Sequence, residues 1–169
     1  ILVQDFDQLG ESVLGPRDIH SQANHMESPG EVVLKDLVQH YCSNFMYENA
    51  KFFAERLYYG NPNSDQLLKS EYLFLLAKCY HGEGKIRQVY HLLKEDTYLP
   101  NRYLFAQSCL ALSKFTEAEK ALFPFKNVHP NDITEKDLAF IPGGAMGIYL
   151  LGVICRHEQR KDYAIAYFQ

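Results

Sequence analysis

A single pattern of apolar and small residues recurs four times along this chain, and it constrains the fold more than any other feature. Each copy begins with four residues spaced three, one and three apart, which places them on one face of an α-helix. The four sets are Leu34, Leu37, Val38, Tyr41; Leu73, Leu76, Ala77, Tyr80; Arg102, Phe105, Ala106, Cys109; and Ile148, Leu151, Gly152, Cys155. The recurrence predicts four helices that pack in the same way.

A second helix follows at a fixed distance in every copy. Twelve residues after the third member of each set stand Ala50, Val89, Ala118 and Ala164, and four residues later stand Ala54, Leu93, Leu122 and Phe168. Small side chains let two helix backbones approach closely, while larger ones fill the space between pairs. The repeat-packing positions that we predict are Leu37, Ala50, Ala54, Ala77, Gly84, Ala106, Ala118, Gly152 and Ala164.

Paired helices at a period of about 34 residues are typical of tetratricopeptide repeats. We therefore expect an all-α fold in which helical hairpins stack in a right-handed superhelix, an α-α superhelix. About four pairs occupy residues 31–169, the last one truncated, and residues 1–30 form an amino-terminal tail or extra segment. Three prolines predict a long loop over 124–142 with at most a short helix.

A rival interpretation makes the short apolar runs 72–77 and 148–154 buried strands. The helical spacing continues past both runs, through Tyr80 and Cys155, which favours helices. The sequence begins without methionine and stops within a helical pattern, so we expect a fragment whose last pair exposes Ile165 and Phe168.

Composition narrows the class of partner. A formal charge of −4, with acids and bases scattered along the chain, argues against a nucleic-acid or membrane-surface partner. No apolar run approaches the roughly 20 residues that cross a bilayer, which predicts a soluble protein. The four cysteines lie far apart, each within a helical pattern; they are Cys42, Cys79, Cys109 and Cys155. We therefore expect them to be reduced thiols in the core of an intracellular protein. Another protein is the expected partner.

Three segments resemble catalytic or cofactor motifs and fail on inspection. Residues 82–85 lack the first glycine and the hydroxyl of a phosphate-binding loop, and the glycines of 143–147 do not follow a strand. The pair His157-Glu158 has Lys161 where a zinc-protease helix needs its second histidine. We therefore predict no catalytic, cofactor or metal site, and no enzyme.

The concave side of such a stack is lined by the first helix of each pair. Phe74, Tyr103 and Tyr149 occupy the same inward position in three successive copies, where a solvated groove would not need aromatic rings. The helix over 51–59 is apolar on more than one side, which favours self-association at this end. The predicted interface residues are Val32, Phe52, Phe53, Tyr58, Phe74, Tyr103, Tyr149 and Arg156. Alternatively, the 124–142 loop or the first 28 residues fold back over the aromatic row.

Four segments resemble the amino-terminal repeats of the anaphase-promoting complex subunit 3 (cell division cycle protein 27) family. They are residues 47–57, 71–80, 102–106 and 142–152, in the same order and with a loop before the last. The resemblance covers about residues 31–169. It implies a scaffold subunit of a ubiquitin ligase in nucleus and cytoplasm, which acts in mitosis, contacts other subunits and forms homodimers through these repeats, with catalysis in other subunits.

A second class of function is a repeat adaptor that binds a peptide or chaperone tail in its concave groove. Such adaptors resemble one another in a carboxylate clamp of Lys, Asn and Arg on the inward faces. Lys35 fits this clamp, but Gln39, Leu75 and Leu104 stand where it needs Asn or a cation. This departure favours the scaffold hypothesis.

Overall fold

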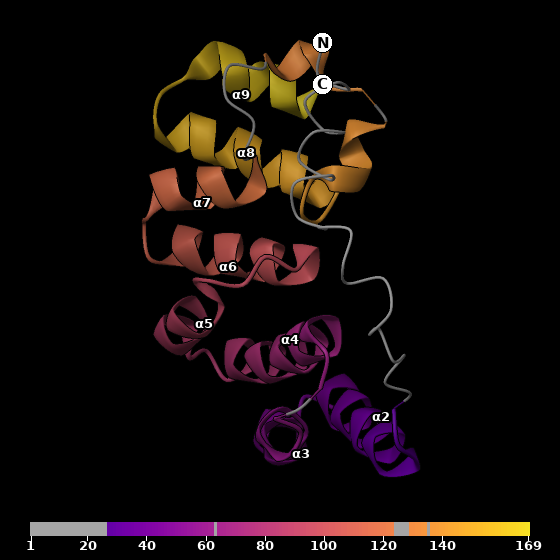
Figure 1. Ribbon diagram of the computed structural model, residues 1–169. Coiled ribbons are helices and arrows are strands. Elements are labelled where there is room, and N and C mark those ends of the chain that lie inside the picture. Colours follow the sequence, from indigo (N-terminus) through magenta and orange to yellow (C-terminus); the bar gives the residue numbers. More distant parts are fainter. Residues whose placement is uncertain (1–26, 63, 124–128, 135) are drawn as a thin grey trace.

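Four helical pairs form the chain in the computed structural model, which describes residues 27–62, 64–123, 129–134 and 136–169. The pairs are α2 (Pro29–Ser43) with α3 (Tyr47–Gly60), α4 (Gln66–Gly82) with α5 (Ile86–Leu93), α6 (Leu99–Ala111) with α7 (Phe115–Leu122), and α8 (Ala145–His157) with α9 (Lys161–Phe168). They stack in chain order from α2 and α3 at one end to α8 and α9 at the other (Figure 1). No strand occurs among these residues, and the runs 72–77 and 148–154 lie in α4 and α8. The predicted helical repeat superhelix is confirmed.

The core consists of the small and apolar positions that recur in the repeats. Seven of these positions are fully buried. They are Val38, Ala77 and Ala106 of the first helices and Ala50, Ala54, Val89 and Ala118 of the second helices. Leu37 is half-buried, and Ala164 and Gly152 are buried in the last pair. Phe168 lies against the backbone of Gly152, where any Cβ atom would meet its ring. Small residues thus mark where the helices of a pair approach most closely.

Each pair is closed by the same turn. The backbone amide of the residue just before the second helix donates to a carbonyl five positions earlier, as in a Schellman motif. These bonds are Met46 to Tyr41, Lys85 to Tyr80, Lys114 to Cys109 and Arg160 to Cys155, at 2.8–2.9 Å. The residue before each donor has positive φ: Phe45 at 59°, Gly84 at 74°, Ser113 at 58° and Gln159 at 61°. We expected Gly84 among the packing residues, but it is exposed and serves this turn instead.

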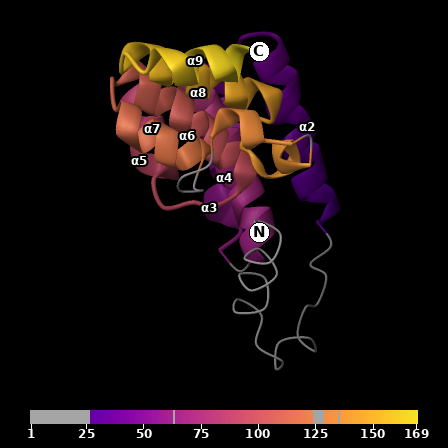
Figure 2. The same cartoon turned by 90° about the horizontal axis from the view of Figure 1, so that it is seen from above.

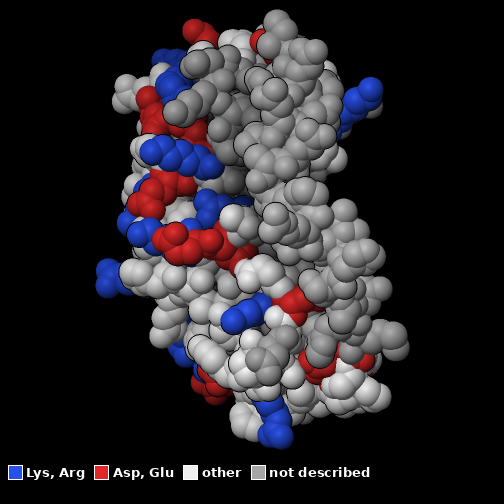
Figure 3. Space-filling model, viewed as in Figure 1, with Lys and Arg blue, Asp and Glu red and all other residues white. Residues whose placement is uncertain are grey.

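Three of these turns carry a cation that ties neighbouring elements together. The Nη2 atom of Arg160 donates to Glu119 of α7 at 2.7 Å, and Lys114 Nζ donates to the hydroxyl of Tyr90 in α5 at 3.0 Å. Lys85 pairs with Glu83 of its own turn, which also accepts from Lys51 of α3 at 2.8 Å. Charged side chains of both signs gather along the edge where these turns lie (Figure 3).

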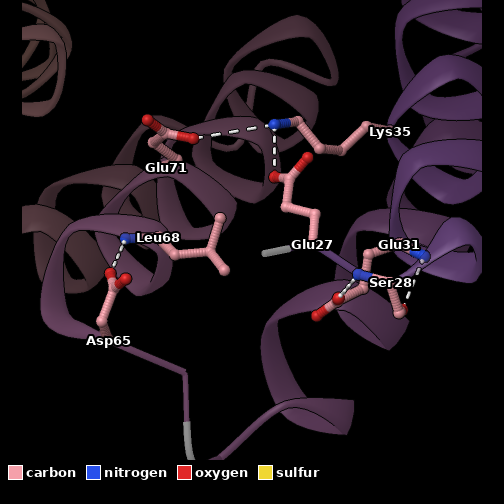
Figure 4. Close-up of polar contacts among 7 residues, drawn as sticks. All are labelled: Glu27, Ser28, Glu31, Lys35, Asp65, Leu68 and Glu71. Carbon is pink, nitrogen blue, oxygen red and sulfur yellow. Dashed lines mark hydrogen bonds and ion pairs between the residues drawn. The ribbon is translucent and has the colours of Figure 1, made fainter. Parts of the chain in front are cut away.

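The start of α2 is capped, and Lys35 joins this helix to α4 of the second pair (Figure 4). Ser28 and Glu31 form a capping box at the start of α2, which therefore begins slightly before the predicted residue 31. Lys35 Nζ lies 2.6 Å from a carboxylate oxygen of Glu27 and 3.6 Å from one of Glu71 in α4. The expected tail at 1–30 otherwise lies outside the described residues.

The predicted 124–142 loop is described from residue 129, except for residue 135, and contains two short 3-10 helices instead of at most one. These are η1 (Pro130–Asp132) and η2 (Asp137–Phe140). We call residues 129–134 and 136–144 the strap. His129 contacts the ring of Tyr163 in α9 at 5.1 Å between centroids, and Pro130 is buried. The strap lies on the side of the stack toward which α2 projects (Figures 1 and 2).

Gly147 offers a test of close packing where α8 leaves the strap. An added Cβ atom would collide with the carbonyl oxygen of Pro142, which is backbone and cannot swing aside. We expect Gly147→Ala to lower the free energy of unfolding by about 2 kcal/mol, as overpacking does. Urea denaturation followed by circular dichroism measures this. The control is Gly60→Ala, where nothing lies within 4 Å of the new atom. An equal effect of both substitutions would contradict the packing account.

Glu83 offers a test of the turn ion pairs by pH. Burial of the carboxylate opposes ionisation, but hydrogen bonds and charges from Lys51 and Lys85 outweigh it and lower the pKa of Glu83. Its contribution to stability is therefore present above the unfolded pKa of about 4.3 and lost as pH falls through the lower folded value. Glu83→Gln should cost about 1–2 kcal/mol at pH 7, and the difference should shrink below about pH 4. Thermal melts across pH check this, with exposed Glu95→Gln as the control.

Candidate protein-interaction surfaces

A wide groove opens between the start of α2 and the second half of α3. Its volume is about 860 Å³. The lining residues are Ser28, Pro29, Gly30, Glu31, Val33, Leu34, Phe52, Phe53, Arg56, Gly60 and Asn61. We call this surface the first-repeat groove. It contains two of the residues that the sequence predicts for an interface, Phe52 and Phe53.

The two phenylalanines have different roles in the groove. Phe53 is half-buried and stacks on Tyr41 of α2, with ring centroids 5.6 Å apart and planes 5° from parallel. Phe52 meets the ring of Phe53 edge to face at 5.2 Å and is 60% exposed. Phe53 therefore adds to the packing between α2 and α3 and contacts one side of Phe52, whose ring stays largely exposed.

The polar part of the groove is held in place by the cap of α2. The backbone amide of Ser28 donates to the Glu31 carboxylate at 2.6 Å, and Glu31 is buried. Burial and the Glu31 carboxylate together raise the pKa of Tyr72 in α4. Arg56 is exposed at the lining. Exposed aromatic and Arg side chains on an apolar wall are typical of surfaces that bind other proteins.

Two further predicted interface residues lie outside this groove. Val32 is exposed on α2 but does not line it. Tyr58 is half-buried and packs against the core of the first two pairs and that of the later pairs. Burial raises the pKa of its hydroxyl. The Tyr58 ring therefore already belongs to the contact between repeats, which explains the apolar second side of α3.

The strap covers the middle of the predicted aromatic row. Phe74 and Tyr103 are half-buried against the core, and the backbone of Gly143 lies on the Tyr103 ring, where a Cβ atom would clash. A pocket of about 380 Å³ remains between these rings, Leu99 and the strap residue Ile141. The alternative that the loop folds back over the row thus holds at Tyr103.

Tyr149 is separate from this covered part. It is 52% exposed and contacts the ring of Phe168 in α9, with centroids 5.6 Å apart. Arg156 is exposed near the end of α8. The structure therefore brings Phe74 and Tyr103 together in one pocket, and neither Tyr149 nor Arg156 lines that pocket. Ile165 and Phe168 are exposed at this end of the stack, as expected.

The described part of the chain contains no group of three or more His, Cys, Asp or Glu side chains placed to hold a metal ion. Within the same residues, no helix has the length and apolarity that crossing a membrane requires. The cysteines described are free thiols, three of them buried and Cys42 half-buried. Two apolar pockets, the first-repeat groove and the pocket at Phe74 and Tyr103, remain as the candidate contact surfaces among these residues.

Arg56 and the contact of Gly143 with Tyr103 were not predicted from sequence. Arg56 lies four positions after Phe52 and three after Phe53, so helical spacing alone could have placed it on their face. Gly143 and Tyr103 are forty positions apart, and no periodic signal joins them. Their contact depends on the path of the strap.

Comparison with known proteins agrees with this architecture. Residues 43–125 match the family model described as anaphase-promoting complex, cyclosome, subunit 3. The chain is 37% identical over 139 residues to cell division cycle protein 27 homolog A of Arabidopsis thaliana, across 82% of this chain and 17% of that protein. It is 33% identical over 141 residues to cell division cycle protein 27 homolog of Homo sapiens, across 79% and 15%.

A more distant relative is Protein bimA of Emericella nidulans, which is 28% identical over 141 residues, across 78% of this chain and 17% of that protein. The chain thus spans about a sixth of the length of the relatives it matches. The matched residues include the helices that build the first-repeat groove and the pairs stacked upon it. The repeat region of this chain belongs to the anaphase-promoting complex subunit 3 family.

Proposed function

We propose that this chain acts as a non-catalytic scaffold subunit of the anaphase-promoting complex, a ubiquitin ligase of the cell cycle, in nucleus and cytoplasm. The support is the family match over residues 43–125 and the similarity to cell division cycle protein 27 homologs over about four fifths of the chain. A stack of helical pairs is suited to this role, because it presents long surfaces to several partners at once. Its contacts with other subunits of the ligase follow from the same proposal.

Within this role, the chain forms a homodimer through its first repeat. The observation that carries the proposal is Phe52, a large apolar ring 60% exposed in the first-repeat groove of about 860 Å³. Val33 is 57% exposed on the facing helix. A two-fold dimer uses the same patch on both copies. The Phe52 ring of each copy can therefore enter the groove of the other copy.

The adaptor alternative has less support from the geometry. Lys35, the residue that fits a carboxylate clamp, already pairs with Glu27 and Glu71. The strap also occupies the concave side at Tyr103. A carboxylate tail would have to displace both contacts before it could bind, which costs part of its binding energy.

The scaffold role is tested by isolating the full-length protein, with a small tag, from dividing cells of its own source. Other subunits of the ligase should co-purify, identified by mass spectrometry, and the isolated assembly should transfer ubiquitin. Co-purification of chaperones without any ligase subunit would instead favour the adaptor.

The dimer is tested by substituting the exposed ring. Light scattering across a hundredfold dilution should give twice the chain mass of 19.5 kDa at high concentration, and Phe52→Asp should give the monomer mass. An Asp at the buried centre of an interface is expected to cost at least about 2 kcal/mol, or roughly a 30-fold weaker dimer.

The matched control is Ile165→Asp, because Ile165 is an equally exposed apolar residue at the opposite end. It should leave the dimer intact. Phe53 is unsuitable for this test, because its ring holds α2 against α3. A monomer at every concentration, or a dimer lost only with Ile165→Asp, would overturn the assignment of the interface.

A further inference from the structure

Cys42 of α2 and Cys79 of α4 face each other across the joint between the first two repeats. Their Sγ atoms are 3.8 Å apart although the residues lie 37 positions apart in the chain. Cys79 is fully buried, whereas Cys42 is half-buried. The pair therefore combines a thiol that solvent can reach with a second thiol directly behind it.

We propose that Cys42 and Cys79 form a reversible disulfide when the protein meets a hydroperoxide, and that this bond fastens the first repeat to the second. A reactive cysteine with a resolving cysteine beside it is the arrangement that redox-sensing proteins use. The sulfur atoms must approach from 3.8 Å to about 2.05 Å. Side-chain rotation supplies movements of this size.

The chemistry proceeds in two balanced steps. The Cys42 thiol gives its proton to water, and the thiolate attacks one oxygen of the hydroperoxide. The O–O bond breaks, Cys42 becomes a sulfenic acid, and the alkoxide or hydroxide that leaves takes up a proton from water to form the alcohol or water. The Cys79 sulfur then attacks the Cys42 sulfur, the S–O bond breaks, and the leaving hydroxide takes up the Cys79 proton as water. The two thiols lose two electrons in total, and the hydroperoxide gains them.

The order of the steps follows from exposure. Cys42 is the thiol that the oxidant can reach, and burial raises the pKa of the Cys79 thiol, which makes Cys79 slow to react first. Cys109 and Cys155 are fully buried, and burial raises the pKa of both thiols. These two residues therefore act as internal controls for general oxidation.

The bond would act on the end of the stack that carries the first-repeat groove. The joint between α2 and α4 is also crossed by the ion pair of Lys35 and Glu71, at 3.6 Å. A covalent link would fix the angle between these helices more firmly than this half-buried ion pair can. This effect depends on the geometry of the two thiols and holds whether or not the protein forms a homodimer.

The test treats the reduced protein with a small excess of hydrogen peroxide, blocks remaining thiols and digests with trypsin. Mass spectrometry should find the peptide 36–51 joined to the peptide 79–85, with Cys109 and Cys155 still reduced. The melting temperature should rise on the order of 5 °C and return after treatment with dithiothreitol. Helix content by circular dichroism should stay constant.

Two variants make the result decisive. Cys42→Ser should leave Cys79 reduced under the same treatment, and Cys79→Ser should leave Cys42 to pass on to sulfinic acid. If Cys79→Ser does not fold, Cys79→Ala serves the same purpose. Sulfinic acid on Cys42 of the unsubstituted protein without the cross-linked peptide would overturn the proposal. So would oxidation of Cys109 at the same rate as Cys42.

Discussion

The close approach of two helices at small buried side chains is the interaction on which the rest of the structure depends. Ala50, Ala77, Ala106 and Ala118 are fully buried where the helices meet. Because these side chains are short, the next turn of each helix can interlock with its neighbour. The turns between the helices then repeat one geometry, since the helices they join cross in the same way.

Among the residues that the structure describes, the first helical pair carries the candidate interface. In the later pairs, the residue before the second helix is Lys85, Lys114 or Arg160, and each pairs with neighbouring polar groups. The first pair has Met46 at that position, and it is exposed. The first pair therefore has an apolar side chain where the later pairs have a cation, and it also exposes Phe52. Exposed apolar side chains of this kind favour contact with another protein.

Features set by local spacing could be predicted from the sequence, whereas contacts between distant segments could not. The buried positions follow a helical period, so the four helical pairs could be predicted from the sequence. The turn cations could also have been found, because each stands four residues before Val89, Ala118 or Ala164. The contact of Gly143 with Tyr103 and the hydrogen bond from Asn101 to the Ser70 carbonyl, at 2.9 Å, have no such period. Gly84 was misjudged because a turn and a packing site can both select glycine.

The central claim is that a second copy covers the first-repeat groove. Hydrogen–deuterium exchange at low and at high protein concentration tests it most directly, because it maps protection along the chain. The account predicts that amides at the start of α2 and in α3 around Phe52 become more protected at high concentration, while α8 and α9 stay unchanged. Protection confined to the end that carries Tyr149 and Ile165, or none anywhere, would contradict it.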